Sequence, residues 1–582
     1  MKFEIENLNK NATVTCTERV MAEGLIEQDL AVVFSEPTKP ERLTLRFRVP
    51  CVDTYLIWTP QNSFQRALSP DWWWQVSQAR LAAGAPIMTL LSKSGENRMT
   101  ITHSDPNHKS KICAGLCEEQ ADFRLELHFL IDPMNPITEY HTTLRFDTRK
   151  MRYDDAIMDV EKWWEERFGY TGAYVPDHAK LPMYSAWYSF HQELDPDALV
   201  YECKRAKKLG METIIIDDGW QTDNNERGYA FCGDWELATS KIPDMKELVD
   251  RIHRVGMKVM LWYSVPFVGI HSKAYSRFST MLLDGPAENK DTFCLDPRFK
   301  EVREYLTGIY TTAVRNWGLD GLKLDFIDSF TLTELSEKED PRRDIASLEE
   351  ALDTLLSEVT TALRRIDPDF LIEFRQGYIG PTIRKYGNML RVGDCPDDPI
   401  HNRVGAVDLR LTSGKTAVHS DMIMWHKDDT PEEVATQLLS ILFTVPQISV
   451  RADNITEEQE AVLSHFLDFW KGNRDVLIES PIHAEDPDSN YSLVRAEKED
   501  RIIALANVEK PLTLERIYRD IFFFNATGGE SLLIRSAESL AGAKYTVYDC
   551  TGKRITSGML TGGGVYDFDV PKGGMVNVHT ER

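Results

Sequence analysis

Between residues 181 and 480, short apolar runs alternate with amphipathic helical stretches, and this alternation constrains the fold more than any other feature. Eight of the runs have the length and composition of strands, because each is a short apolar segment followed by turn residues. They begin at residues 183, 212, 257, 321, 370, 389, 416 and 446. Eight strands that alternate with helices along one segment predict a (β/α)8 TIM barrel.

Three of the intervening stretches carry clear helix boundary signals, and they lie at 195–210, 244–256 and 296–318. The first opens with Asp195 as a capping residue and Pro196 behind it, and all three end at glycine. Proline in the first turn and glycine just past the last turn are typical of helix starts and ends. These signals support the helical half of the alternation.

The segments that flank the barrel alternate apolar and polar residues with a period of two, which is typical of half-buried antiparallel strands. Residues 1–153 therefore predict an N-terminal β-sandwich. Residues 154–180 repeat apolar side chains at helical spacing and predict a linker helix that docks this sandwich onto the barrel, 181–480. Residues 481–582 return to short strands and predict a small C-terminal antiparallel β-sandwich.

Charge and cysteine content limit the partners and the compartment. The 582 residues include 67 Lys and Arg and 92 Asp and Glu, a net charge of −25, so nucleic acid and anionic membranes would repel the chain. No signal-peptide pattern and no apolar run long enough for a membrane span occur, which predicts a cytoplasmic protein without membrane contact. The nine cysteines are odd in number and scattered, which predicts reduced thiols.

Catalytic residues of a (β/α)8 barrel lie at the C-terminal ends of its strands. Applied to strands two to six and the loop after strand two, this rule selects one set of carboxylates, cations and tryptophans. The set comprises Asp217, Asp218, Trp220, Trp235, Trp262, Lys323, Asp325, Glu373, Arg375, Arg391 and Asp394.

Such a set predicts a carbohydrate site. Carboxylates accept hydrogen bonds from sugar hydroxyls, and aromatic faces stack on the C–H patches of a pyranose ring. Glycoside hydrolysis also needs a pair of carboxylic acids, one ionised and one protonated. The alternatives are that single aspartates cap helices or pair with lysine, that Asp217 and Asp218 bind a cation such as calcium, and that Trp235 and Trp262 only pack.

A metal-dependent barrel hydrolase is a different class of function. It would need several histidines at strand ends, whereas His191 and His419 each stand alone at theirs. The sequence therefore predicts no metal and no cofactor.

The motifs at these strand ends resemble glycoside hydrolase family 36, the microbial α-galactosidase family of clan D. The resemblance rests on IIIDDGW at 214–220, GDW at 233–235, LKLDF at 322–326 and the segment beginning RVGD at 391. A later stretch, MIMWHKDD with LFTVPQISVR, is also similar. The similarity covers the barrel and agrees with the order of the three predicted domains.

This resemblance implies a retaining mechanism without a metal, carried by two aspartates. Asp325 matches the nucleophile and Asp394 the acid/base, with Asp397 or Asp398 in the same acidic loop as alternatives. The charge of Asp325 is expected to raise the pKa of Asp394. The remaining positions match sugar-contacting residues of the family: Asp217 and Asp218 at the 4- and 6-hydroxyls, with Trp220, Trp235, Trp262, Lys323 and Arg391.

One segment departs from the family pattern. Typical members carry a cysteine- and glycine-rich stretch after strand five that approaches the 2-hydroxyl, whereas this chain has EFRQGYIG with Arg375 and Gln376. A guanidinium offers five fixed donors and no acceptor. Arg375 is expected either to pair with Asp394, Asp397 or Glu373, or to bind the substrate and select a sugar with an additional acceptor.

The sequence thus predicts a retaining exo-α-glycosidase, α-galactosidase-like, that acts on small oligosaccharides. The alternatives are specificity for another or a modified α-hexoside, such as an N-acetylgalactosaminide, and transglycosylation. Because both Asp325 and Asp394 are retained, an inactive carbohydrate-binding protein is disfavoured. The expected partner is a small carbohydrate, and the resemblance allows a homo-oligomer, with the run 72–74 (WWW) as an interface or as sandwich core.

Overall fold

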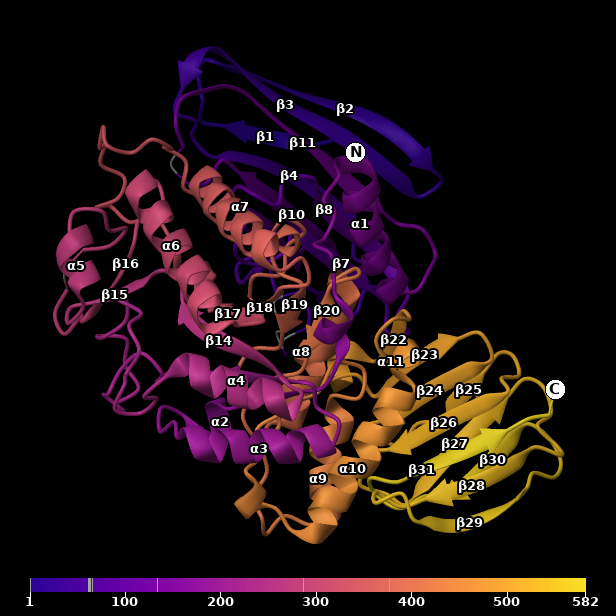
Figure 1. Cartoon of the computed structure of the whole chain (residues 1–582). Helices are drawn as coiled ribbons and strands as arrows, with labels where there is room; N and C mark the ends of the chain where they lie inside the picture. The colour runs from indigo at the N-terminus through magenta and orange to yellow at the C-terminus, as the bar shows by residue number, and fades with distance from the viewer. Residues whose placement is uncertain are drawn as a thin grey trace.

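The computed structural model describes residues 2–60, 64, 66–132, 134–285, 287–375 and 377–581. Gln376 of the departing segment therefore lies outside the described residues. Along the chain, an N-terminal pair of sheets is followed by a parallel barrel with its helices and then by a second sheet domain (Figure 1). The predicted fold class is confirmed, and the domain boundaries at 153, 180 and 480 stay predictions.

The eight predicted strands form one parallel sheet in the order β20-β19-β18-β17-β14-β13-β12-β21. Parallel bridges from His419 to Val445 and from Ile423 to Ile448 join the two ends of this order and nearly close the barrel. The strand bounds are β12 (Met183–Ser185), β13 (Thr213–Ile216), β14 (Lys258–Ser264), β17 (Gly321–Asp325), β18 (Leu371–Arg375), β19 (Met389–Arg391), β20 (Ala417–His419) and β21 (Gln447–Ile448).

The first predicted strand is shorter than its apolar run, because Trp187–Phe190 forms a helix; periodicity alone does not separate a buried strand from a buried helix. A two-stranded ribbon, β15 (Phe267–Gly269) with β16 (Thr292–Cys294), is inserted after β14. The helices of this region are α2 (Trp187–Phe190), α3 (Pro196–Lys208), α4 (Met245–Val255), α5 (Lys273–Phe278), α6 (Lys300–Trp317), α7 (Leu348–Ile366), α8 (Pro399–Thr412), α9 (Pro431–Ser440), α10 (Glu457–Gly472) and α11 (Arg474–Leu477).

The helix boundary signals act largely as predicted. Asp195 caps α3 by accepting from the Ala198 backbone N–H at 2.7 Å, and α4 and α6 end at glycines in the left-handed conformation. The helix predicted from 296 begins only at Lys300. Asp296 instead accepts from the backbone N–H and the guanidinium of Arg298, which holds this segment in a turn.

The N-terminal domain is the predicted β-sandwich, and its two antiparallel sheets enclose a separate apolar core. One sheet contains β1 (Glu4–Asn7), β4 (Leu43–Pro50), β10 (Asp122–Phe129), β9 (Ser110–Cys117) and β6 (Gln75–Ala79). The other contains β2 (Ala12–Ala22), β3 (Leu25–Thr38), β11 (Ile137–Asp147), β8 (Asn97–His103), β7 (Ile87–Leu91) and β5 (Leu56–Trp58).

The predicted linker contains helix α1 (Tyr153–Phe168), which packs against β7, β8 and β22 (Ile482–Glu485). Its buried Trp164 donates from the indole N–H to the His103 carbonyl at 3.0 Å, which fixes the helix on the sandwich.

The C-terminal domain also has two sheets around its own core. It is mainly antiparallel, as predicted, and the structure adds two parallel pairs, β24 (Arg501–Ala506) with β26 (Asp520–Asn525) and β25 (Leu512–Leu514) with β27 (Ser531–Ser536). The larger sheet contains β22 (Ile482–Glu485), β23 (Leu493–Lys498), β24 (Arg501–Ala506), β26 (Asp520–Asn525), β31 (Met575–His579), β28 (Lys544–Tyr548) and β29 (Arg554–Met559). The smaller contains β25 (Leu512–Leu514), β27 (Ser531–Ser536) and β30 (Val565–Asp569).

A buried carboxylate joins the three domains. Asp408 on α8 pairs with Arg66 of the N-terminal domain at 2.8 Å and accepts from the Trp58 indole at 3.2 Å. The Tyr491 hydroxyl of the C-terminal domain donates to the same carboxylate. Because the Asp408 side chain is fully buried and Arg66 is nearly so, the relative position of the domains depends on this ion pair.

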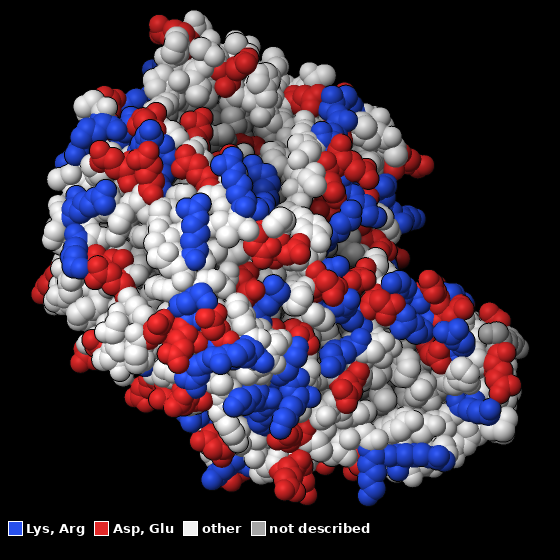
Figure 2. Space-filling view, in the orientation of Figure 1, with Lys and Arg blue, Asp and Glu red and all other residues white. Residues whose placement is uncertain are grey.

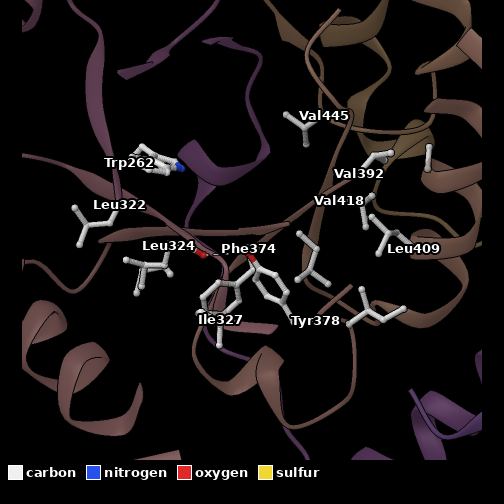
Figure 3. Packing of buried hydrophobic residues seen from close by; sticks show 14 of the residues in the cluster. Trp262, Leu322, Leu324, Ile327, Phe374, Tyr378, Val392, Leu409, Val418 and Val445 are labelled. Atoms are coloured by element: carbon white, nitrogen blue, oxygen red, sulfur yellow. Dashed lines mark hydrogen bonds between the residues drawn. The ribbon is translucent and has the colours of Figure 1, made fainter. Parts of the chain in front are cut away.

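Alternation along the barrel strands positions the site. Leu322, Leu324 and Phe374 belong to the large apolar cluster shared with the surrounding helices (Figure 3). The inward positions nearer the strand starts form a small apolar cluster that includes Met183, Ile215, Met260, Leu371, Met389 and Ala417. Two residues further along the same strands the inward positions are Ser185, Asp217, Trp262, Glu373, Arg391 and His419. The barrel therefore changes from apolar to charged toward its C-terminal mouth.

Acidic and basic side chains are intermixed over the face shown in Figure 2. No helix within the described ranges is long and apolar enough to cross a membrane. All nine cysteines are described, and none of them forms a disulfide.

Candidate active site

A buried ion pair joins strands β13 and β17 at the barrel mouth. Lys323 donates from Nζ to Asp217 Oδ2 at 2.6 Å, and the Asp218 backbone N–H donates to Asp217 Oδ1 at 3.0 Å. The Asp218 carboxylate accepts from the side-chain amides of Gln192 at 2.7 Å and Gln221 at 2.6 Å. Because an ammonium and two amides already surround these oxygens, the pair does not fit the calcium alternative.

Arg391 on β19 lies fully buried among three carboxylates. It pairs with Asp421 through Nη1, with Asp394 through Nη2 at 2.8 Å, and with Glu373 through Nε at 3.5 Å. Glu373 also accepts from the Gln447 amide at 2.5 Å. Because each of these carboxylates comes from a different strand or loop, Arg391 connects β18 to the segments after β19 and β20.

Asp325 ends β17, and its carboxylate is held by donors on both oxygens. The Trp262 indole donates to Oδ2 at 3.1 Å, and the Phe326 backbone N–H donates to Oδ1 at 2.9 Å. The Tyr378 hydroxyl lies 3.4 Å from Oδ1. Only a small part of the side chain is exposed, so this carboxylate is fixed in one orientation at the mouth.

Arg375 contacts Asp325 directly, which is not the pairing expected from the sequence. Its Nε lies 3.1 Å from Asp325 Oδ1, and its Nη2 lies 3.5 Å from Asp328 Oδ1. The guanidinium carbon lies 4.8 Å from the centre of the Phe326 ring. The expected partners Asp394, Asp397 and Glu373 make no ion pair with Arg375 within the described residues.

The expected protonation of Asp394 is wrong for this state of the protein. Burial raises the pKa of its carboxyl, but the charges of Arg391, Lys323 and Arg375, with the Arg391 hydrogen bond, outweigh burial and lower the pKa to about 2. The prediction rested on the charge of Asp325 alone, because the convergence of three cations beside Asp394 depends on contacts between distant segments of the chain.

The alternative acid/base positions face elsewhere. Asp397 accepts from the Gln437 amide of α9 at 2.8 Å, and burial with the charge of Asp429 raises its pKa. Asp398 caps α8 by accepting from the His401 backbone N–H at 2.9 Å. Neither carboxylate pairs with Arg391, Arg375 or Lys323 in the described structure, so they lie apart from the charged mouth.

The three tryptophans of the predicted set occupy different positions around the barrel wall. Trp262 points inward to Asp325. Trp220 is fully buried, donates its indole N–H to the Trp262 carbonyl at 2.9 Å and packs on Trp317 of α6. Trp235 stacks on Trp220 with ring centres 5.9 Å apart. Trp220 therefore packs between the barrel wall and α6, whereas Trp235 contacts both Trp220 and, edge-to-face at 5.9 Å, the ring of Trp262.

The structure adds residues that the sequence reasoning missed. Tyr229 stacks on Trp262 at 6.2 Å, and burial, followed by the charges of Asp218 and Asp325, raises the pKa of its hydroxyl. Its loop has no periodic pattern that would have marked it. Asp421 follows the end of β20, so the strand-end rule would have found it if applied to strand seven.

A further carboxylate, Asp328, lies close to Asp325 and Arg375. It lies in the short 3-10 helix Ile327–Ser329, where burial raises the pKa of its side chain despite the opposing charge of Arg375. Arg80 of the N-terminal domain donates to the backbone carbonyls of Asp328 and Phe330. The sandwich thus supports the segment that follows the candidate nucleophile.

Within the described residues, no group of histidines, cysteines and carboxylates at the mouth has metal-ligand spacing. His419 lies 2.7 Å from the Ala179 carbonyl through Nε2, and burial lowers its pKa to about 4. Among the described residues, one group has metal-ligand spacing, Asp154 with Asp155 and His483 at the junction of α1 and β22. Asp154 already accepts from Arg152 and from the Ala484 backbone N–H, so its oxygens are committed.

Comparison with known proteins points to one family. The family model described as Melibiase matches residues 175–373, from the start of the barrel to its fifth strand. Alpha-galactosidase Mel36A of Lactobacillus acidophilus is 27% identical over 159 residues, 26% of this chain and 20% of that protein. A type blood alpha-D-galactosamine galactosaminidase of Flavonifractor plautii is 26% identical over 195 residues, 30% of this chain and 17% of that protein.

These curated relatives are thus matched over at most 20% of their own length. A solved structure extends the likeness to all three domains. GH36 α-galactosidase AgaA of Geobacillus stearothermophilus, in complex with stachyose, superimposes with a TM-score of 0.67 at 13% identity, covering 98% of this chain and 81% of that one. The segment from residue 175 to residue 373 is thus similar to the family model described as Melibiase, and the whole chain has the fold of the solved GH36 α-galactosidase AgaA.

Proposed function

We propose that this protein is a retaining exo-α-glycosidase of the α-galactosidase type, which removes terminal α-linked galactose or a related hexose from small oligosaccharides. The observation that carries the proposal is the environment of Asp325, a nearly buried carboxylate at the barrel mouth that accepts from Trp262 and Phe326. Asp394 lies beside the same cations, since Arg375 and Arg391 each interact with both carboxylates.

In the proposed mechanism, an Asp325 oxygen attacks the anomeric carbon and displaces the aglycone, so that a β-glycosyl ester forms. The fixed donors hold the carboxylate toward the substrate. Asp394 donates a proton to the departing oxygen, then removes a proton from the water that attacks the ester, and the released sugar keeps the α configuration. A retaining mechanism requires the two carboxyl groups to lie about 5–5.5 Å apart.

The residues on strands β13, β17 and β19 are proposed to bind the sugar. Asp217 and Asp218 would accept from its hydroxyls, with Lys323 and Arg391 as donors, and Trp262 would present its ring. Trp220 and Trp235 are proposed to hold Trp262 in place, because Trp220 donates to the Trp262 carbonyl and the Trp235 ring packs edge-to-face on the Trp262 ring at 5.9 Å.

Arg375 is proposed to select the sugar. Its Nε and Nη2 face Asp325 and Asp328, and its Nη1 has no partner among the described residues. An ester at C1 places the ring oxygen and the C2 substituent nearest the nucleophile. A cationic donor there favours a C2 substituent that accepts a hydrogen bond and disfavours a charged 2-amino group. This favours a second candidate, an α-glycosidase for a modified galactoside such as a 2-acetamido sugar.

A panel of p-nitrophenyl α-glycosides tests the proposal. We expect turnover of the α-galactoside or of a 2-acetamido analogue, release of the α-sugar first by NMR, and no turnover by Asp325→Ala. Turnover by Asp325→Ala at the wild-type rate, or β-sugar as the first product, would contradict the proposed mechanism. Equal rates on many α-hexosides would contradict the selection by Arg375.

Cytoplasmic location and a homo-oligomer stay predictions. Trp72 and Trp73 are 71% and 69% exposed, so this part of the tryptophan run is not sandwich core. Trp74 is partly buried, and the Arg124 guanidinium lies 5.4 Å from its ring centre. Light scattering on the purified chain would measure the oligomeric state.

A further inference from the structure

A groove of about 520 Å³ runs along the outer face of α6, away from the charged mouth. Helix α6 lies between α4 and α7 (Figure 1). The helix supplies one wall, and Asp234 and Trp235 from the loop after β13, with Arg277 of α5, supply the other. Apart from Trp235, which packs on Trp262, none of these side chains belongs to the set of residues proposed above for catalysis and sugar binding.

The helix presents a regular stripe to this groove. Glu304, Gly308, Thr312 and Asn316 recur every four residues, so they lie above one another on one face of α6. At about 1.5 Å per residue, the stripe is about 18 Å long. That length suits an extended chain molecule better than a single small ring.

Gly308 is the least expected member of the stripe. A glycine in the middle of a helix is unfavourable compared with alanine. A Cβ built on Gly308 would meet no atom within 4 Å, so the packing of this chain does not require glycine here. The bare backbone at this position leaves room for another molecule to approach α6 closely.

Aromatic side chains line the groove on both sides of this position. Tyr305, Trp317 and Trp235 contribute to its walls. The Tyr305 hydroxyl donates to the Gly233 carbonyl at 2.8 Å, which fixes the ring. Trp235 has a φ of 55°, which is strained for a bulky residue and is often found at functional positions.

The charges in the groove indicate what it can bind. Asp234, Glu301 and Glu304 outnumber Arg277, so an anionic ligand would be repelled. Asp234 is committed to the Lys273 and Ala274 backbone N–H groups. Arg277, placed over the Tyr305 ring at 5.2 Å, makes no hydrogen bond or ion pair in the described structure and keeps its donors free.

We infer that this groove is a second carbohydrate-binding site, which holds a neutral oligosaccharide against α6. Rings of Tyr305 and Trp317 would face its C–H patches, and Arg277, Thr312 and Asn316 would bind its hydroxyls. This inference rests on the proposed function, because neutral oligosaccharides are the substrates of a glycosidase of this type. Binding there would raise the local concentration of substrate near the enzyme.

Gly308 also provides the test. Gly308→Leu fills the groove from the helix, whereas the matched control Gly308→Ala adds one methyl and leaves the groove open. Both changes favour the helix, so neither is expected to unfold the protein. Each is combined with Asp325→Asn in the full chain, and stachyose is titrated into each variant by calorimetry while light scattering follows the mass.

We expect two stachyose sites in the Asp325→Asn parent and in the Gly308→Ala variant, and one in the Gly308→Leu variant. A single site that Gly308→Leu leaves intact would overturn the inference and leave the proposed function standing. A single site that Gly308→Leu removes, without turnover of any α-glycoside by the wild type, would support the groove and contradict the proposed function. A change of mass on Gly308→Leu would identify the groove as a contact between copies and overturn the inference.

Discussion

Asp394→Asn separates the two steps of the proposed mechanism, and its effect depends on the proton of Asp394. With the pKa of this carboxyl near 2, about one molecule in 10⁴ carries that proton at pH 6, since each pH unit is a factor of ten. The side chain is 49% exposed, so solvent screens the cations and this fraction is a lower bound. We therefore expect kcat/KM for poor leaving groups to rise as the pH falls from 7 toward 4.

The replacement removes this proton donor but keeps the shape of the side chain. For substrates with poor leaving groups, the first step, in which Asp325 is glycosylated, should slow by about 10²–10⁴-fold. The rate of this step should also no longer depend on pH. Dinitrophenyl glycosides, whose leaving group needs no proton, should be cleaved in the first step at nearly the wild-type rate. Stopped-flow measurement of the first turnover on both substrates, from pH 4 to pH 8, gives these rates.

Asp397→Asn is the matched control, because Asp397 lies in the same acidic loop but pairs with Gln437 rather than with Arg391. This replacement should change the rate of the first turnover by no more than a few-fold on either substrate. Equal losses on both substrates in Asp394→Asn would refute the assignment of Asp394. A large, leaving-group-dependent loss in Asp397→Asn would move the acid/base role to that residue.

Three further predictions address the nucleophile, the specificity and the domain junction. Asp325→Ala should abolish turnover, and azide should restore it with a β-glycosyl azide as product; an α-azide by NMR would contradict the role. Arg375→Met should narrow the difference in kcat/KM between plain and 2-acetamido galactosides, whereas equal losses on every glycoside would place Arg375 in the catalytic machinery. Arg66→Met leaves Asp408 buried without its cation and should lower the free energy of unfolding by about 3–5 kcal/mol in denaturant titration; a loss below 1 kcal/mol would contradict this role.

The architecture was largely predictable because it depends on local periodicity. Eight apolar runs with helical stretches between them specify a barrel, and glycines such as Gly256 and Gly318 mark where helices end. The errors lie where an apolar run is ambiguous, as at Trp187–Phe190, or where a side chain forms a turn, as at Asp296. Both features depend on contacts of particular side chains, and the periodicity of the sequence contains no information about such contacts.

For the candidate site, the sequence was sufficient to predict which strand ends carry polar residues. Asp217, Lys323, Glu373 and Arg391 do meet at one mouth, because inward positions of parallel strands share one layer. Asp421 was missed only because strand seven was not read to its end. Tyr229 could not be found in this way, since it reaches the mouth from an irregular loop.

The sequence by itself determined the barrel, its order of domains and the resemblance on which the candidate catalytic pair rests, because local apolar patterns and short motifs are properties of the chain. Only the tertiary structure decided the partners of those residues. Arg375 faces Asp325, Trp220 packs against Trp317 of α6, and Trp235 packs on both Trp220 and Trp262. The cations around Asp394 lower its pKa instead of raising it. Electrostatic interactions depend on distances between side chains far apart in sequence, and folding alone sets those distances.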